Sequence, residues 1–135
     1  MRLFLDANIL FSAARADGAI RAMLSLLHEK GHACRVDGYV LEEARRNLLA
    51  KAPASLAWLD STMTRFHIQP IGPRDLILEG SLPLVEKDKP VLTAAIHSGC
   101  DYLVTGDRTH FGALFGLSIQ GVKVMSPAQL AEELL

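Results

Sequence analysis

The 135-residue chain has few cysteines, no long hydrophobic run and almost no net charge. Its two cysteines, Cys34 and Cys100, lack metal-ligand or redox spacing, so we expect small buried thiols rather than a disulfide framework. Because the apolar runs are only a few residues long, a membrane-spanning helix is excluded. The opening apolar run ends at Asp6 and is too short for a signal-peptide core. These absences predict a cytoplasmic protein.

The formal net charge of −1 excludes binding to polyanions through a general excess of positive charge. Any binding to nucleic acid must therefore come from a local group of lysines and arginines. The charge balance by itself neither supports nor excludes a nucleic-acid substrate. Half of the residues are hydrophobic, which predicts a single compact domain over residues 1–135.

Short apolar runs alternate with amphipathic stretches, a pattern typical of β-α-β units around a parallel sheet. We expect strands at residues 2–5, 33–36, 68–71, 102–105 and 122–125. We expect helices at residues 19–30, 40–50, 55–66, 90–98 and 127–134, with short ones from Pro73 and after Asp107. Ser126 and Gln129 have capping-box spacing at the start of the last helix. The sequence thus predicts an α/β fold with a central, mostly parallel sheet of four or five strands flanked by helices.

Four acidic residues lie where predicted strands end or predicted helices begin. Asp6 follows the first strand, and Asp107 follows the strand at 102–105. Glu43 lies early in the helix expected at 40–50, and Asp88 precedes the helix expected at 90–98. Ligands of open parallel sheets bind outside the carboxyl ends of the strands, so these acids can converge. Converged carboxylates repel one another, and a shared divalent cation relieves that repulsion.

Each of these acids also has an ordinary structural explanation. Asp6 would suit the N-cap of a helix, and Asp107 would suit a plain turn after Gly106. Glu43 would suit the first turn of its helix, and the adjacent Glu42 competes for any functional role. Four separate structural explanations are needed at four points that one fold can bring together. That coincidence favours a common site.

Asp88 is the acid that is hardest to explain as a helix cap. If Pro90 is the first helical residue, Lys89 would hold the cap position. Asp101 is a different case, because it lies at the start of a strand. We expect Asp101 to be a turn or cap residue at the opposite end of the sheet.

The segments around these acids, in their order and spacing, resemble the PIN-domain nucleases, a family that includes the toxin ribonucleases of VapBC toxin–antitoxin pairs. The resemblance rests on residues 5–10 (LDANIL) and 40–48 (VLEEARRNL), and most firmly on 87–95 (KDKPVLTAA) running into 99–107 (GCDYLVTGD). Residues 122–127 (VKVMSP) are similar to the family's last strand and the start of its last helix. Each motif is short and weakly specific, but the resemblance covers nearly the whole chain, and in this order and spacing the set is strong.

The resemblance implies a three-layer PIN-like fold and a Mg²⁺- or Mn²⁺-dependent ribonuclease. The family's metal-site acids fall on Asp6, Glu43, Asp88 and Asp107. Asn8 and Thr105 match accessory polar positions that would hold a carboxylate or a water. Oxygen ligands favour hard cations, and the five histidines lack the paired spacing of a zinc site. A metal-activated water would attack phosphorus and leave a 5′-phosphate and a 3′-hydroxyl.

The resemblance also bears on substrate and partners. Basic residues near the acids would hold the RNA backbone, and the candidates are Arg45, Arg46, Arg108 and His110. A solvated surface charge is the commoner role of any single arginine. An antitoxin would place a basic side chain in the acidic pocket, and a homodimer is the family habit. A stand-alone PIN nuclease of RNA processing remains the alternative to a toxin.

Other functional classes stay open at this level. A haloacid-dehalogenase-type phosphatase also uses an Asp after its first strand and a late Gly-Asp pair, but here Asp6-Ala7-Asn8 replaces its D-x-D pattern. A non-catalytic PIN-like domain that binds RNA or protein would have no use for four unpaired carboxylates. A phosphorelay receiver domain is disfavoured, because its N-terminal acid pair and late lysine are missing.

Overall fold

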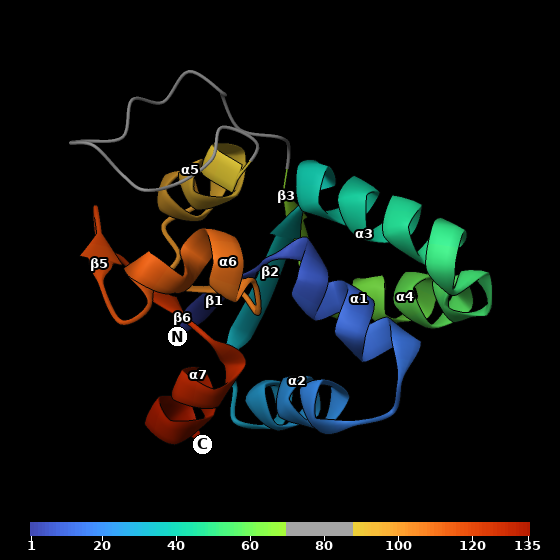
Figure 1. Ribbon diagram of the computed structural model, residues 1–135. Helices are drawn as coiled ribbons and strands as arrows, with labels where there is room; N and C mark the ends of the chain where they lie inside the picture. Colours follow the sequence, from blue (N-terminus) through green and yellow to red (C-terminus); the bar gives the residue numbers. More distant parts are fainter. Residues whose placement is uncertain (70–87) are drawn as a thin grey trace.

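The computed structural model describes residues 1–69 and 88–135 (Figure 1). In this part of the chain, six strands form one sheet in the order β3-β2-β1-β4-β6-β5. The parallel strands are β1 (Arg2–Leu5), β2 (Ala33–Asp37), β3 (His67–Gln69), β4 (Tyr102–Val104) and β6 (Val122–Met125). The short β5 (Ser118–Ile119) pairs antiparallel with β6. The predicted α/β fold with a mostly parallel sheet is confirmed.

Helices connect these strands. They are α1 (Ala7–Arg15), α2 (Ala19–Glu29), α3 (Gly38–Lys51), α4 (Leu56–Thr62), α5 (Lys89–His97), α6 (Arg108–Phe111) and α7 (Pro127–Leu134). Short 3-10 turns lie at Pro53–Ser55, Met63–Arg65 and Gly112–Leu114. The capping box that begins α7 is present as expected from the sequence. No helix of the described residues is long and apolar enough to cross a membrane.

Several elements differ from the sequence-based expectation. Helix α1 was not among the expected helices, although Asp6 was considered as a helix N-cap. The strand β5 was not anticipated, because it is only two residues long and leaves little pattern to read. It turns into β6 through Gln120 and Gly121, whose φ angles are both positive, at 48° and 87°. The helix α3 begins at Gly38, two residues before the expected start, because the Asp37 side chain accepts a hydrogen bond from the Val40 backbone N–H at 2.9 Å. The short helix expected from Pro73 lies outside the described residues.

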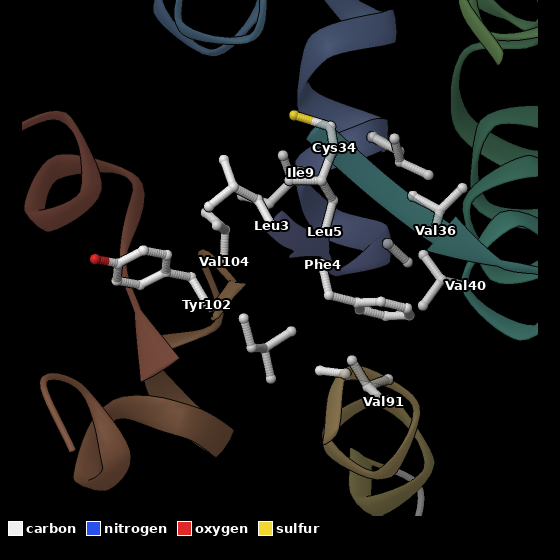
Figure 2. Packing of buried hydrophobic residues seen from close by; sticks show 14 of the residues in the cluster. Leu3, Phe4, Leu5, Ile9, Cys34, Val36, Val40, Val91, Tyr102 and Val104 are labelled. Atoms are coloured by element: carbon white, nitrogen blue, oxygen red, sulfur yellow. The ribbon is translucent and has the colours of Figure 1, made fainter. Parts of the chain in front are cut away.

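The core is built on both faces of β1, whose side chains point alternately to opposite sides of the sheet. Figure 2 shows Phe4 pointing toward Val91 of α5, whereas Leu3 and Leu5 lie on the other side with Ile9 of α1. Leu3, Phe4 and Leu5 are all fully buried. The sheet is therefore covered by helices on both faces, and Asp6 is a buried carboxylate at the junction of β1 and α1.

Both cysteines are free and buried, as the sequence suggested. Burial raises the pKa of the Cys34 thiol to about 12, and the neighbouring Cys100 adds to that shift. Burial also raises the pKa of Cys100. At neutral pH neither side chain is a reactive thiolate, so these residues act as small apolar groups in the core.

Candidate functional site

Four acidic side chains line one cleft of about 240 Å³: Asp6, Glu43, Asp88 and Asp107. Strands β1 and β4 are parallel neighbours in which Leu5 pairs with Val104, so their carboxyl ends lie side by side. Asp6 directly follows β1, and Asp107 follows β4 after two residues. Asp88 precedes α5, and Glu43 comes from α3. The acids that the sequence analysis selected do meet, as expected from the sheet topology.

Asp6 is the most buried of these acids, with only 5% of its surface exposed. Its Oδ1 accepts a hydrogen bond from the Ala7 backbone N–H at 2.7 Å, and its Oδ2 accepts one from the Thr105 hydroxyl at 2.9 Å. Burial raises the pKa of Asp6 to about 6, and the charges of Glu43 and Asp88 push it in the same direction. The hydrogen bonds from Thr105 and Ala7 oppose that rise. An ionised Asp6 is therefore costly until a positive charge joins it.

Asn8 and Thr105 join the ends of β1 and β4. The fully buried Thr105 hydroxyl, besides donating to Asp6, accepts from the Asn8 side-chain amide at 3.1 Å and from the Asp107 backbone N–H at 3.2 Å. The Asn8 amide also donates to Asp6 Oδ2 at 3.1 Å, and its oxygen accepts from the Gly106 N–H at 2.8 Å. These bonds hold Asp6 and Asp107 in fixed relative positions. The resemblance implies such a supporting role for Asn8 and Thr105.

His110 lies against two of the acids. Its Nδ1 is 2.8 Å from Asp107 Oδ2 and 3.0 Å from Asp88 Oδ2. The other oxygen of Asp107 accepts a hydrogen bond from the His110 backbone N–H at 3.0 Å and so caps α6. Asp88 occupies the N-cap position of α5, but its side chain makes no capping hydrogen bond. The carboxylate of Asp88 is thus directed to the site rather than to its helix.

One face of α3 completes the cleft. Glu43, Asn47 and Lys51 follow one another at four-residue spacing and all line it, together with Phe11 of α1. Of the two adjacent glutamates, Glu43 lines this cleft and Glu42 lines a separate depression. Asn47, Lys51 and Phe11 were not predicted from the sequence to line the cleft. The four-residue spacing after Glu43 was the signal that could have identified Asn47 and Lys51.

Arg45 and Arg46 do not lie beside the acids, contrary to the expectation from their closeness to Glu43. Both are exposed and line a separate depression with Glu42 and Leu49. Arg45 also forms an ion pair with Asp60. Arg45 is two residues after Glu43 and points about 200° away from it around the helix, so closeness in sequence did not place it on the same face. Arg108 is exposed at the start of α6, next to Asp107. RNA binding by these arginines stays a prediction.

Asp101 lies at the other end of the sheet, as expected. Its Oδ2 accepts a hydrogen bond from the Arg2 backbone N–H at 2.8 Å, where β1 begins. The chain therefore offers, outside the acid cleft, an aspartate with a purely structural contact. That makes Asp101 a useful reference for substitutions in the cleft.

A larger cavity, of about 340 Å³, lies away from the acids between α2 and α4. Its lining is mostly apolar and includes Trp58, Phe66 and Cys34 but no carboxylate. The Arg21 guanidinium packs over the Trp58 ring, with its central carbon 4.4 Å from the ring centroid, and donates to the Ala13 carbonyl at 2.9 Å. Three histidines, His28, His32 and His67, line it as well, but its described lining offers no carboxylate oxygen for a hard cation, so the candidate metal site is the smaller acid cleft.

No family model and no curated protein matches this chain. Solved structures are similar to it over most of its length. One is VapBC2 from Rickettsia felis bound to a DNA fragment from their promoter, with a TM-score of 0.69 and 20% identity over 93% of this chain and 98% of that one. Another is Mycobacterium tuberculosis VapC20, a Sarcin-Ricin loop cleaving toxin, with a TM-score of 0.60 and 13% identity over 82% of this chain and 94% of that one. At identities of 20% and 13%, these structural similarities show a common fold and nothing further.

Proposed function

Because the chain has the PIN-domain fold of the VapC toxin structures, we propose that it is a divalent-metal-dependent endoribonuclease that hydrolyses RNA phosphodiester bonds. The observation that carries the proposal is the meeting of Asp6, Glu43, Asp88 and Asp107 in one cleft. Fold alone does not specify a reaction, so the argument rests on the chemistry of this site.

The side chains of the cleft fit a hard divalent cation. Carboxylate oxygens are the preferred ligands of Mg²⁺ and Mn²⁺, and the raised pKa of Asp6 reflects a buried acid among like charges. Asp6, Asp88 and Asp107 would hold the ion, with Glu43 at the edge of the same cleft. When bound, the ion would lower the pKa of a water molecule and neutralise charge on the scissile phosphate.

The chain's own residues would position the reactants. Thr105 and Asn8 donate hydrogen bonds to Asp6 Oδ2, which favours the ionised carboxylate and fixes its orientation. Glu43 would orient the attacking water and accept its proton. Lys51, on the same face of α3, would contact the phosphate backbone. Attack by water breaks the bond between phosphorus and O3′, so the products carry a 5′-phosphate and a 3′-hydroxyl.

The finer assignment is the toxin of a toxin–antitoxin pair. One similar structure is of VapBC2 bound to DNA from their promoter, and the other is a toxin that cleaves the Sarcin-Ricin loop. We propose an antitoxin partner that inserts a basic side chain among the four carboxylates, where it would take the place of the cation. A homodimer and a cytoplasmic location belong to the same proposal.

The test compares wild-type protein with Asp6→Asn, using Asp101→Asn as the matched control. We expect Mn²⁺-dependent cleavage of a structured RNA by the wild type and by Asp101→Asn, and a loss of about a hundredfold or more in Asp6→Asn. Mapping of the fragments should find 5′-phosphate and 3′-hydroxyl ends. Equal activity of Asp6→Asn and wild type, or cyclic-phosphate ends, would contradict the mechanism.

The same protein samples separate the other functional classes. Turnover of nitrophenyl phosphate without RNA cleavage would indicate a phosphatase. Absence of Mn²⁺ binding in a calorimetric titration would indicate a non-catalytic binding domain. Thermal melting of each variant shows whether a lost activity reflects lost folding.

A further inference from the structure

The contacts of His110 are unusual for a hydrogen-bonded histidine. Its Nδ1 lies within 3.0 Å of two carboxylate oxygens, one from Asp107 and one from Asp88. A ring nitrogen carries one proton or one lone pair, which points outward in the ring plane. At most one of the two carboxylates can therefore be well aligned with it. His110 Nδ1 and Asp88 Oδ2 are both shielded from solvent.

The same three atoms are spaced like ligands around one metal ion. One ligand atom from each of Asp88, Asp107 and His110 lies within 4.8 Å of the others. In an octahedral shell with bonds of about 2.1 Å, neighbouring ligand atoms are about 3 Å apart. The distances of 2.8 and 3.0 Å from His110 Nδ1 to the two oxygens agree with that spacing.

The start of α6 fixes His110 in this position. Asp107 caps the helix by accepting a hydrogen bond from the His110 backbone N–H, which holds the two residues in a set relation three positions apart. Asp88 comes from the start of α5 and reaches the same point. Two helix N-termini therefore bring two oxygens and one nitrogen together, and the convergence does not depend on a flexible side chain alone.

We propose that His110 is a nitrogen ligand of the cation in the acid cleft, beside Asp88 and Asp107, and that it makes the site select Mn²⁺ over Mg²⁺. The inference rests on the proposed function for the presence of a cation. Imidazole suits first-row transition metals, whereas Mg²⁺ prefers oxygen ligands and retains its water. The ligand set expected from the sequence contained only oxygen atoms, and this proposal adds one nitrogen to it. His110, which was expected to contact RNA, is thereby assigned to metal binding.

The competing arrangement is a protonated His110 that neutralises the two carboxylates without metal. The two arrangements predict opposite effects of removing the imidazole. A ligand strengthens Mn²⁺ binding, so its loss weakens binding. A positive charge in the cleft repels a cation, so its loss strengthens the binding of Mn²⁺ and Mg²⁺ alike.

The test uses wild-type protein, His110→Asn and the control His97→Asn, which removes an exposed histidine at the end of α5. Pulsed electron paramagnetic resonance of bound Mn²⁺ should detect a directly coordinated ¹⁴N in wild type and His97→Asn and none in His110→Asn. Calorimetric titrations with MnCl₂ and MgCl₂ should give a Mn²⁺-to-Mg²⁺ affinity ratio that falls roughly tenfold or more in His110→Asn.

Three results would overturn the proposal: no ¹⁴N coupling in wild type, no Mn²⁺ binding, or tighter binding of both ions by His110→Asn. Cleavage of RNA is scored separately on the same samples. If ¹⁴N coupling is present but wild type cuts no RNA, the ligand assignment stands and the nuclease function fails. If Mn²⁺-dependent cleavage occurs without ¹⁴N coupling, the nuclease stands and His110 is not a ligand.

Discussion

At the scale of single residues, Asp6 and Asp107 divide their two carboxylate oxygens between a helix and the cleft. Asp6 Oδ1 accepts from the first N–H of α1, while Oδ2 faces Thr105 and Asn8. Asp107 Oδ1 caps α6, while Oδ2 faces His110. The structural and functional explanations weighed for these acids are therefore compatible. An Asn substitution keeps an oxygen for the cap and removes the charge, which makes it the informative change.

The first prediction concerns Asp6 and pH in metal-free protein. Burial raises the pKa of Asp6 to about 6 from an ordinary value of 3.8, so the folded state binds this proton more tightly than the unfolded state does. The stabilisation that this tighter proton binding gives the folded state is present below pH 4 and is lost as pH rises through 6. The free energy of unfolding changes on the order of 3 kcal/mol at most. Asp6→Asn lacks this dependence.

Urea unfolding with a chelator at several pH values measures the effect. We expect the free energy of unfolding of Asp6→Asn minus that of wild type to be larger at pH 7.5 than at pH 4, which means that the variant gains stability relative to wild type as the pH rises. Asp101→Asn, at the other end of the sheet, should not follow this trend. A difference between Asp6→Asn and wild type that is constant across this range would mean that Asp6 titrates as an ordinary surface acid.

At the scale of the element, α3 shows what the sequence could and could not predict. The helix was evident from its pattern, and the capping box of α7 was correctly identified from four consecutive residues. Both are local signals. The face that α3 presents to the cleft is not local, because it depends on the Asp37 cap and on packing against α1. For that reason Arg45 and Arg46 were expected beside the acids, where they do not lie, and Lys51 was not predicted to line the cleft. The convergence of the acids was predictable because it follows from the order of the strands.

The second prediction belongs to this face of α3. Lys51 lines the acid cleft, so we expect Lys51→Ala to weaken RNA binding and to lower the slope of log affinity against log salt by about one. The exposed Lys30, at the end of α2, provides the control Lys30→Ala. Filter binding of RNA at several salt concentrations, with Ca²⁺ in place of Mn²⁺ to limit cleavage, measures both quantities. If Lys51→Ala leaves the slope of log affinity against log salt unchanged, Lys51 does not contact the RNA backbone.

At the scale of the whole molecule, the chain has almost no net charge yet gathers four carboxylates outside the carboxyl ends of its central strands. The sheet order makes this possible, since β1 and β4 are neighbours although most of the chain separates them in sequence. The order of motifs was sufficient to predict the fold and the meeting of the acids. His110 was expected near the acids, but its contact with both Asp107 and Asp88 was not, because that contact depends on how the N-termini of α5 and α6 approach each other.

The last prediction links this gathered charge to the stability of the fold. A cation that binds the native cleft but not the unfolded chain stabilises the protein, by about 2.7 kcal/mol when its concentration is a hundred times Kd. We expect Mn²⁺ to raise the Tm of wild type, and a chelator to reverse the rise. The rise should be larger at pH 7.5 than at pH 5, because the pKa of Asp6 is about 6 and the ion must displace its proton at the lower pH. Asp6→Asn with Asp88→Asn should show little rise at either pH, whereas Asp101→Asn should behave as wild type. A rise of equal size in the double variant would place the bound ion outside the cleft.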